Sequence, residues 1–210
     1  NVYDNRFDGV QVAYGKDVKL VAGYGKAAHL NGVNDADNAK ANAKDTYYAE
    51  LSGKVENLSL AAGYYKFEDV KEEAGVDDTI WTVAANYAFD KNFKLGAMYL
   101  NGDQDNYKGD DDGFVVTASY KGAKAAKAGS WGLVAKYYDQ GFSTYIDHTM
   151  NGYADKYAST TEGFKGYSVG ANYALAKNIV AGVTYYDLES KEAKGTPDAQ
   201  TLWSQVVFSF

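Results

Sequence analysis

Apolar and polar residues alternate along most of this chain with a period of two. In the stretch FKLGAMY, residues 93–99, phenylalanine, leucine, alanine and tyrosine alternate with lysine, glycine and methionine. Successive side chains of a β-strand point to opposite faces, so this period predicts strands and not helices. The stretches TVAANY (82–87) and FKLGAMY are echoed by SVGANY (168–173) and IVAGVTY (179–185). The chain therefore contains a repeated strand–turn–strand unit.

The repeat predicts an all-β fold of about eleven antiparallel strands joined alternately by short and long connections. We expect the strands near residues 6–14, 18–26, 45–54, 58–67, 79–89, 93–102, 113–121, 130–140, 163–175, 179–189 and 200–210. The short connections fall near 15–17, 55–57, 90–92, 122–129 and 176–178, and the long ones near 27–44, 68–78, 103–112, 141–162 and 190–199.

Each strand has one apolar face and one face of polar and small residues, which we do not expect to form a second hydrophobic core. A soluble barrel or sandwich turns the apolar face inward, whereas a transmembrane barrel turns it toward lipid. Tyrosines at both ends of the apolar face favour the membrane, because amphipathic rings gather at both membrane interfaces. The proposed aromatic belt consists of Tyr14, Tyr87, Tyr120 and Tyr173 near one rim and Tyr24, Tyr64, Tyr99, Tyr137 and Tyr185 near the other.

Composition agrees with this picture. Tyrosine accounts for 20 of 210 residues, and the mean hydropathy is -0.45, with no apolar run long enough for a membrane helix. The absence of cysteine excludes a disulfide scaffold and a cysteine zinc site. The net charge of -7 argues against nucleic acid as a partner.

The chain ends in the alternating sequence QVVFSF. This strand resembles the C-terminal signature of bacterial outer-membrane β-barrel proteins, and the Ala-x-Tyr hairpins resemble the general porin family. The composition also resembles the barrels of porins that carry an S-layer-homology domain in diderm Firmicutes. The resemblance implies an outer-membrane location, contact with lipid and lipopolysaccharide, a homotrimer, and Phe208 and Phe210 as a signal for the barrel assembly machinery.

The resemblance also orients the barrel, with the C-terminus and the short turns in the periplasm. Residues 1–5 are then extracellular. Bacterial barrels normally have an even number of strands, so an odd count predicts that at least one N-terminal strand is missing. We expect the last eleven strands of a sixteen-stranded barrel of about 300 residues, with its constriction loop before or at residues 1–5. A small barrel of twelve strands, similar to oligosaccharide-specific channels, is the alternative.

Polar residues of the second face are candidates to line the pore. A lysine facing lipid at the membrane midplane costs about 2–4 kcal/mol, so lysines at that depth must point inward. Lysines near the short turns would favour anions, or they are solvated rim charges without selectivity. The candidates are Lys19, Glu50, Lys54, Asn86, Lys94, Lys121, Lys136 and Asn172. Inward aromatic residues could stack on sugars or simply pack against the wall; these are Tyr48, Tyr138, Tyr186 and Trp203.

The long loops are acidic, and Asp103–Asp112 superficially resembles a calcium loop but lacks the EF-hand spacing. We interpret these loops as solvated surface, with no metal or other cofactor. The acidic residues are Asp35, Asp37, Glu68, Asp69, Glu72, Glu73, Asp77, Asp78, Asp103, Asp105, Asp110, Asp111 and Asp112.

We do not expect an enzyme. The set Ser143, His148 and Asp147 contains the residue types of a hydrolase triad, but residues so close in an extended loop diverge. The leading hypothesis is a porin for passive diffusion of small hydrophilic solutes. The alternatives are a barrel that anchors the outer membrane to the cell wall through an absent N-terminal domain, and a soluble barrel that binds an apolar ligand.

Overall fold

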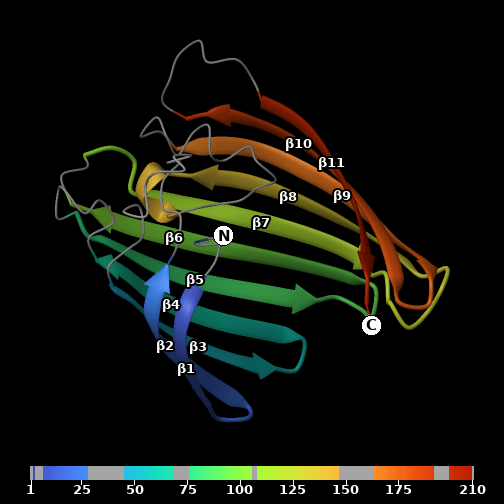
Figure 1. Cartoon of the computed structure of the whole chain (residues 1–210), viewed down its shortest axis with the longest axis horizontal. Coiled ribbons are helices and arrows are strands. Elements are labelled where there is room, and N and C mark those ends of the chain that lie inside the picture. Colours follow the sequence, from blue (N-terminus) through green and yellow to red (C-terminus); the bar gives the residue numbers. More distant parts are fainter. Residues whose placement is uncertain are drawn as a thin grey trace.

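The computed structural model describes residue 2 and residues 7–27, 45–68, 76–105, 108–146, 163–191 and 199–209. Within these residues the protein is all β, with eleven strands in one sheet and one short 3-10 turn, η1 (Phe142–Thr144) (Figure 1). The strands are β1 (Phe7–Tyr14), β2 (Val18–Ala27), β3 (Asp45–Val55), β4 (Leu58–Glu68), β5 (Asp78–Ala88), β6 (Phe93–Gln104), β7 (Asp112–Lys121), β8 (Trp131–Gln140), β9 (Phe164–Ala176), β10 (Ile179–Ser190) and β11 (Ala199–Phe208).

The strand assignment made from the alternation is confirmed, with every strand end within two residues of its expected position. None of the described segments forms a helix with the length and apolar character needed to cross a membrane.

Each strand pairs with its neighbours in the chain, in the order β1 to β11, and every pairing is antiparallel. In the described residues β1 pairs only with β2, and β11 only with β10, so the sheet has two open edges and is not closed into a barrel. Figure 1 shows the strands as one curved and twisted sheet. The strand ends joined by the short turns lie at one end of the sheet, here called the short-turn end, and the strand ends that lead into the long connections lie at the other, the long-loop end.

The register places the repeated apolar positions of neighbouring strands on one face. Residues directly opposite each other in an antiparallel pair point to the same side. Leu20 lies opposite Leu51, and Leu60 lies opposite Ala85, which lies opposite Ala97. The face that carries these residues is called the outer face. Its large apolar side chains are exposed, as the fractions of 61% for Val83 and 57% for Trp81 show.

The other face, called the inner face, carries Lys19 opposite Ser52 and Lys94 opposite Ser119. The expectation that this face holds no hydrophobic core is wrong at the long-loop end, where a buried apolar cluster lies. Most of its side chains come from the loop-proximal ends of the strands, and Tyr145 and Ile146 of the segment after β8 belong to it. The cluster comprises Val2, Ala27, Phe67, Val76, Ile80, Leu100, Val115, Tyr138, Tyr145, Ile146, Phe164, Leu188 and Ala199.

Candidate functional site

Two rows of aromatic side chains cross the outer face. Five strands each carry aromatic residues six positions apart, and at about 3.3 Å per residue this interval is roughly 20 Å along the strand. The pairs are Trp81 and Tyr87, Phe93 and Tyr99, Phe114 and Tyr120, Trp131 and Tyr137, and Tyr167 and Tyr173. Between the rows lie mainly aliphatic residues such as Val83, Leu95 and Leu133.

Neighbouring rings touch within each row. Near the long-loop end the ring centroids of Tyr64 and Trp81 lie 4.4 Å apart, and those of Tyr24 and Tyr47 lie 5.1 Å apart. Near the short-turn end the rings of Tyr120 and Trp131 lie 5.8 Å apart. The structure thus places the tyrosines expected in the belt on the outer face, in these two rows; they are Tyr14, Tyr87, Tyr120 and Tyr173 at the short-turn end and Tyr24, Tyr64, Tyr99, Tyr137 and Tyr185 at the long-loop end.

The polar half of the inner face lies toward the short turns. Asn86 lies opposite Gly96, and Asn172 lies opposite Gly182, so the sequence repeat reproduces the same pair on two hairpins. A Cβ on either glycine would overlap the Oδ1 atom of its asparagine. The amide side chains therefore lie flat over the glycines, so this part of the inner face is polar and its side chains project little from the sheet. Of the other pore-lining candidates, Lys54 lies opposite Ser59 and Lys136 opposite Thr117, on the same face.

A hydrogen-bonded group of side chains crosses the inner face from β1 to β4. The hydroxyl of Tyr48 donates to Oε1 of Gln11 at 2.6 Å, and the hydroxyl of Tyr65 donates to Oε1 of Glu50 at 2.6 Å. The two tyrosine rings lie nearly parallel, with centroids 6.3 Å apart. The carboxylate of Glu50, a pore-lining candidate, is therefore fixed by a hydrogen bond from the Tyr65 hydroxyl.

The aromatic residues considered for sugar stacking differ in their surroundings. Tyr138 is buried, 3.3 Å from the hydroxyl of Ser168, and its ring packs beside Phe164. Tyr186 packs against the same apolar cluster. These two rings therefore pack within the protein, as the second interpretation of the sequence expected for them. Trp203 lies opposite Thr184 on the inner face of β11 and is 41% exposed.

Residues 141–146 fold against the inner face at the long-loop end, where η1 contacts β5, β6 and β7 (Figure 1). All six residues are buried. The amide of Gly141 donates to the carbonyl of Asp112 at 3.0 Å, and the amide of Ile146 donates to the carbonyl of Val2 at 2.9 Å. The hydroxyl of Ser143 donates to the carbonyl of Gly102 at 3.3 Å. The alternation predicts only a long connection near 141–162 here, and the apolar content of residues 142–146, FSTYI, is the signal in the sequence that such a segment packs.

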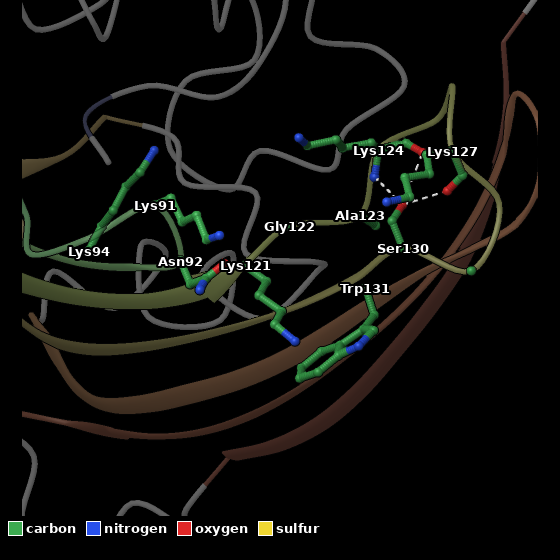
Figure 2. Close-up of a pocket in the computed structure, with 11 residues that line it drawn as sticks. Lys91, Asn92, Lys94, Lys121, Gly122, Ala123, Lys124, Lys127, Ser130 and Trp131 are labelled. Atoms are coloured by element: carbon green, nitrogen blue, oxygen red, sulfur yellow. Dashed lines mark hydrogen bonds between the residues drawn. The ribbon is translucent and has the colours of Figure 1, made fainter.

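Five lysines surround a hollow of about 580 Å³ at the short-turn end. Figure 2 shows Lys91 from the turn before β6 and Lys94 from the start of β6 on one side, and Lys124 and Lys127 from the turn after β7 on the other. Lys121 lies between them, with its ammonium 4.3 Å from the centroid of the Trp131 ring. The described residues that line this hollow include no Asp or Glu. Lys94 and Lys121 were predicted from the alternation of their strands, whereas Lys91, Lys124 and Lys127 lie in turns, where no alternation assigns a side chain to a face.

An ion pair joins two long connections at the opposite end. The ammonium of Lys191 pairs with the carboxylates of Asp110 and Asp139. Burial acts to raise the pKa of Asp110, but the hydrogen bond and charge of Lys191 outweigh it and hold that pKa below its ordinary value. Carboxylate oxygens of Asp110, Asp111 and Asp112 lie within 4.8 Å of one another, a grouping that a hard cation could use. The three carboxylates repel one another, and the positive charge of Lys191 beside Asp110 offsets part of this repulsion.

The triad considered from the sequence cannot be assembled from the described residues. Ser143 is buried and bonded to the backbone of β6, while Asp147 and His148 lie outside the described residues. Phe208 ends β11 on the outer face, opposite Ile179, and is 57% exposed. Phe210, the second residue of the expected assembly signal, also lies outside the described residues.

No known family model matches this chain, and no curated protein shows significant sequence similarity to it.

Proposed function

We propose that this chain forms the wall of a transmembrane β-barrel in a bacterial outer membrane, a water-filled channel for passive diffusion of small hydrophilic solutes and ions. The observation that carries the proposal is the outer face: an exposed apolar band bordered by two aromatic rows and continuous over many strands of one sheet. Monomeric soluble proteins rarely expose apolar patches beyond a few hundred Å². Membrane barrels carry an apolar band about 25 Å tall between aromatic girdles.

The inner face supports a wet lumen. Its short-turn half carries Lys19, Lys94 and the two asparagine–glycine pairs, and Glu50 lies in the middle of β3; an apolar ligand site would not use these groups. At its long-loop end, residues 141–146 are buried and their 3-10 turn packs against β5, β6 and β7. We propose that this segment narrows the channel, and that transport has no chemical step, with the rate set by the opening and the lining charges.

Closure of the barrel is part of the proposal. Unpaired backbone groups at the edges of β1 and β11 cannot face lipid, because each costs several kcal/mol there. Further strands of the same barrel, which the odd strand count predicts, would pair with both edges. The homotrimer, the contact with lipopolysaccharide and recognition by the assembly machinery remain predictions from the porin resemblance.

Conductance in planar lipid bilayers tests the proposal. The natural mature protein that contains this chain is refolded in detergent, checked for β-structure by circular dichroism, and added to the bilayer. We expect stepwise, long-lived current increases that scale with salt concentration. Folded protein that inserts into the bilayer and yields no current steps would contradict the channel and leave a membrane anchor as the better explanation.

A further inference from the structure

The lysine hollow at the short-turn end concentrates positive charge on a fixed backbone. Like charges held together repel, and an anion that enters the hollow offsets this repulsion. The five lysines belong to none of the ion pairs found among the described residues. Asp90, beside Lys91, is the adjoining carboxylate, and it accepts hydrogen bonds from the backbone amides of Asn92 and Phe93 at 2.6 and 2.8 Å.

The turn that carries Lys124 and Lys127 is built by a single hydroxyl. Oγ of Ser130 accepts a hydrogen bond from the amide of Lys124 at 2.7 Å. The same hydroxyl donates to the carbonyl of Lys127 at 2.6 Å (Figure 2). The amide of Lys127 donates to the carbonyl of Lys124 at 2.8 Å. Both lysine backbones are therefore fixed before any ligand arrives.

The same turn is also tied to its neighbours in the sheet. The amide of Gly129 donates to the carbonyl of Ala174 at 2.8 Å, and the amide of Ala174 donates to the carbonyl of Ser130 at 2.8 Å. The amide of Lys121 donates to the carbonyl of Asn92 at 2.6 Å, which joins the two lysine-bearing turns. Only the lysine side chains remain to be ordered by a ligand, and this lowers the entropic cost of binding.

Lys121 is positioned by aromatic rings. Its ammonium lies 4.3 Å from the centroid of Trp131 and 5.3 Å from that of Tyr120, within the range of cation–π attraction. The rings hold this charge beside the hollow without neutralising it, since they are uncharged.

We propose that this hollow binds multiply charged, phosphate-bearing anions. Ammonium groups are common phosphate ligands, and several of them suit an anion with several charges better than a single carboxylate or chloride. The volume of about 580 Å³ has room for more than one phosphate group. Anion binding at this site does not require transport, so the proposal is tested independently of the proposed channel. The phosphate can belong to a free oligophosphate or to a lipid headgroup.

Isothermal titration of the folded full chain in nonionic detergent at low salt tests the site, with tripolyphosphate and inorganic phosphate as probes. We expect saturable binding of tripolyphosphate, tighter than that of phosphate and weakened by added salt. The double variant Lys124→Gln/Lys127→Gln should weaken tripolyphosphate binding by about tenfold or more, since two charge-assisted hydrogen bonds are lost. Lys124→Arg/Lys127→Arg should retain it.

Lys16→Gln/Lys26→Gln is the matched control, because it removes the same charge from the first hairpin, outside the hollow. The inference is overturned if tripolyphosphate does not saturate the wild-type chain, or if the control weakens binding as much as the double variant. Addition of phosphatidylglycerol distinguishes the sources. If phosphatidylglycerol competes with tripolyphosphate for the wild-type chain and not for the double variant, the ligand is a lipid headgroup. If tripolyphosphate binds and phosphatidylglycerol does not compete, the ligand is a free solute.

Discussion

At the scale of single residues, Gly102 of β6 is the point where the segment of residues 141–146 comes closest to the sheet. A Cβ at this position would overlap the backbone carbonyl of Ser143, and a backbone atom cannot turn aside as a side chain can. The glycine is therefore required by the close approach of residues 141–146. At Gly53, in contrast, an added Cβ would meet atoms no nearer than 3.6 Å, which is ordinary van der Waals contact.

We expect Gly102→Ala to lower the free energy of unfolding by about 1–3 kcal/mol, the usual cost of overpacking, and to open residues 141–146 to protease. Gly53→Ala should change it by about 1 kcal/mol or less, because Ala suits a strand interior better than Gly. Urea unfolding in detergent micelles and limited proteolysis measure the two effects. Equal stability and equal protease resistance of the two variants would show that the segment does not rest on Gly102.

The ion pair of Lys191 makes a prediction about pH. Burial acts to raise the pKa of Asp110, but Lys191 holds it below the ordinary 3.8, so this stabilisation is present above that pH and is lost as pH falls through the folded value. Burial acts to lower the pKa of Lys191, yet its two carboxylates raise it above 10.5, so its contribution is complete below that pH and is lost as pH rises further. The pair is thus fully effective between about pH 4 and 10.

Lys191→Gln should therefore lower the free energy of unfolding by about 1–3 kcal/mol at pH 7, with the difference from wild type shrinking below pH 4. The control is Lys165→Gln, which breaks the more exposed pair with Glu189 and should have little effect. Urea unfolding at several pH values measures both. A difference that is the same at pH 7 and pH 3 would mean that Lys191 acts by packing and not by charge.

At the scale of strands, the two faces of β4 differ in what they contact. Leu60 lies on the outer face and is 49% exposed, while the adjacent Ala61 lies on the inner face at the same depth. If lipid covers the outer face, a charge at position 60 loses its hydration and a charge at position 61 keeps it.

We predict that Leu60→Lys lowers the free energy of unfolding in lipid vesicles by about 2–4 kcal/mol more than Ala61→Lys does. Reversible urea unfolding in vesicles of defined thickness measures the difference. The reverse order, with the inner-face lysine more costly, would mean that the inner face is the dry one and would favour a soluble barrel.

The strands themselves were predictable because period-two alternation is a local property, and the turn residues lie between the alternating runs. The buried cluster of Ile80, Leu100 and Leu188 was not, since these residues occupy inner-face positions, where the alternation predicts mostly polar and small neighbours. The strands of Ile80 and Leu100 pack against the distant segment 141–146, and this contact between residues far apart in the sequence leaves no periodic signal. The lysine hollow was partly hidden for a similar reason, because turns bring Lys91 and Lys124 to one hollow across the two strands β6 and β7.

At the scale of the whole molecule, residues 141–146 should limit the channel. Their 3-10 turn packs on the inner face against β5, β6 and β7 at the long-loop end, away from the polar short-turn end. We expect the natural mature protein with residues 142–146 replaced by a Gly/Ser linker to give larger conductance steps than wild type. Planar bilayer recordings at equal salt compare the two. Unchanged step size in a folded variant would place the narrowest point elsewhere.

The most direct test of the central claim, that the outer face meets lipid and the inner face meets water, uses two tryptophans. Trp81 lies in the outer aromatic row, and Trp203 lies on the inner face of β11. Variants of the natural mature protein that keep one of them, with phenylalanine at the other tryptophans, are refolded into vesicles whose acyl chains are brominated. We predict strong quenching of Trp81 by the brominated lipid and quenching of Trp203 by aqueous acrylamide. Trp81 that is quenched by acrylamide and not by lipid would contradict the account.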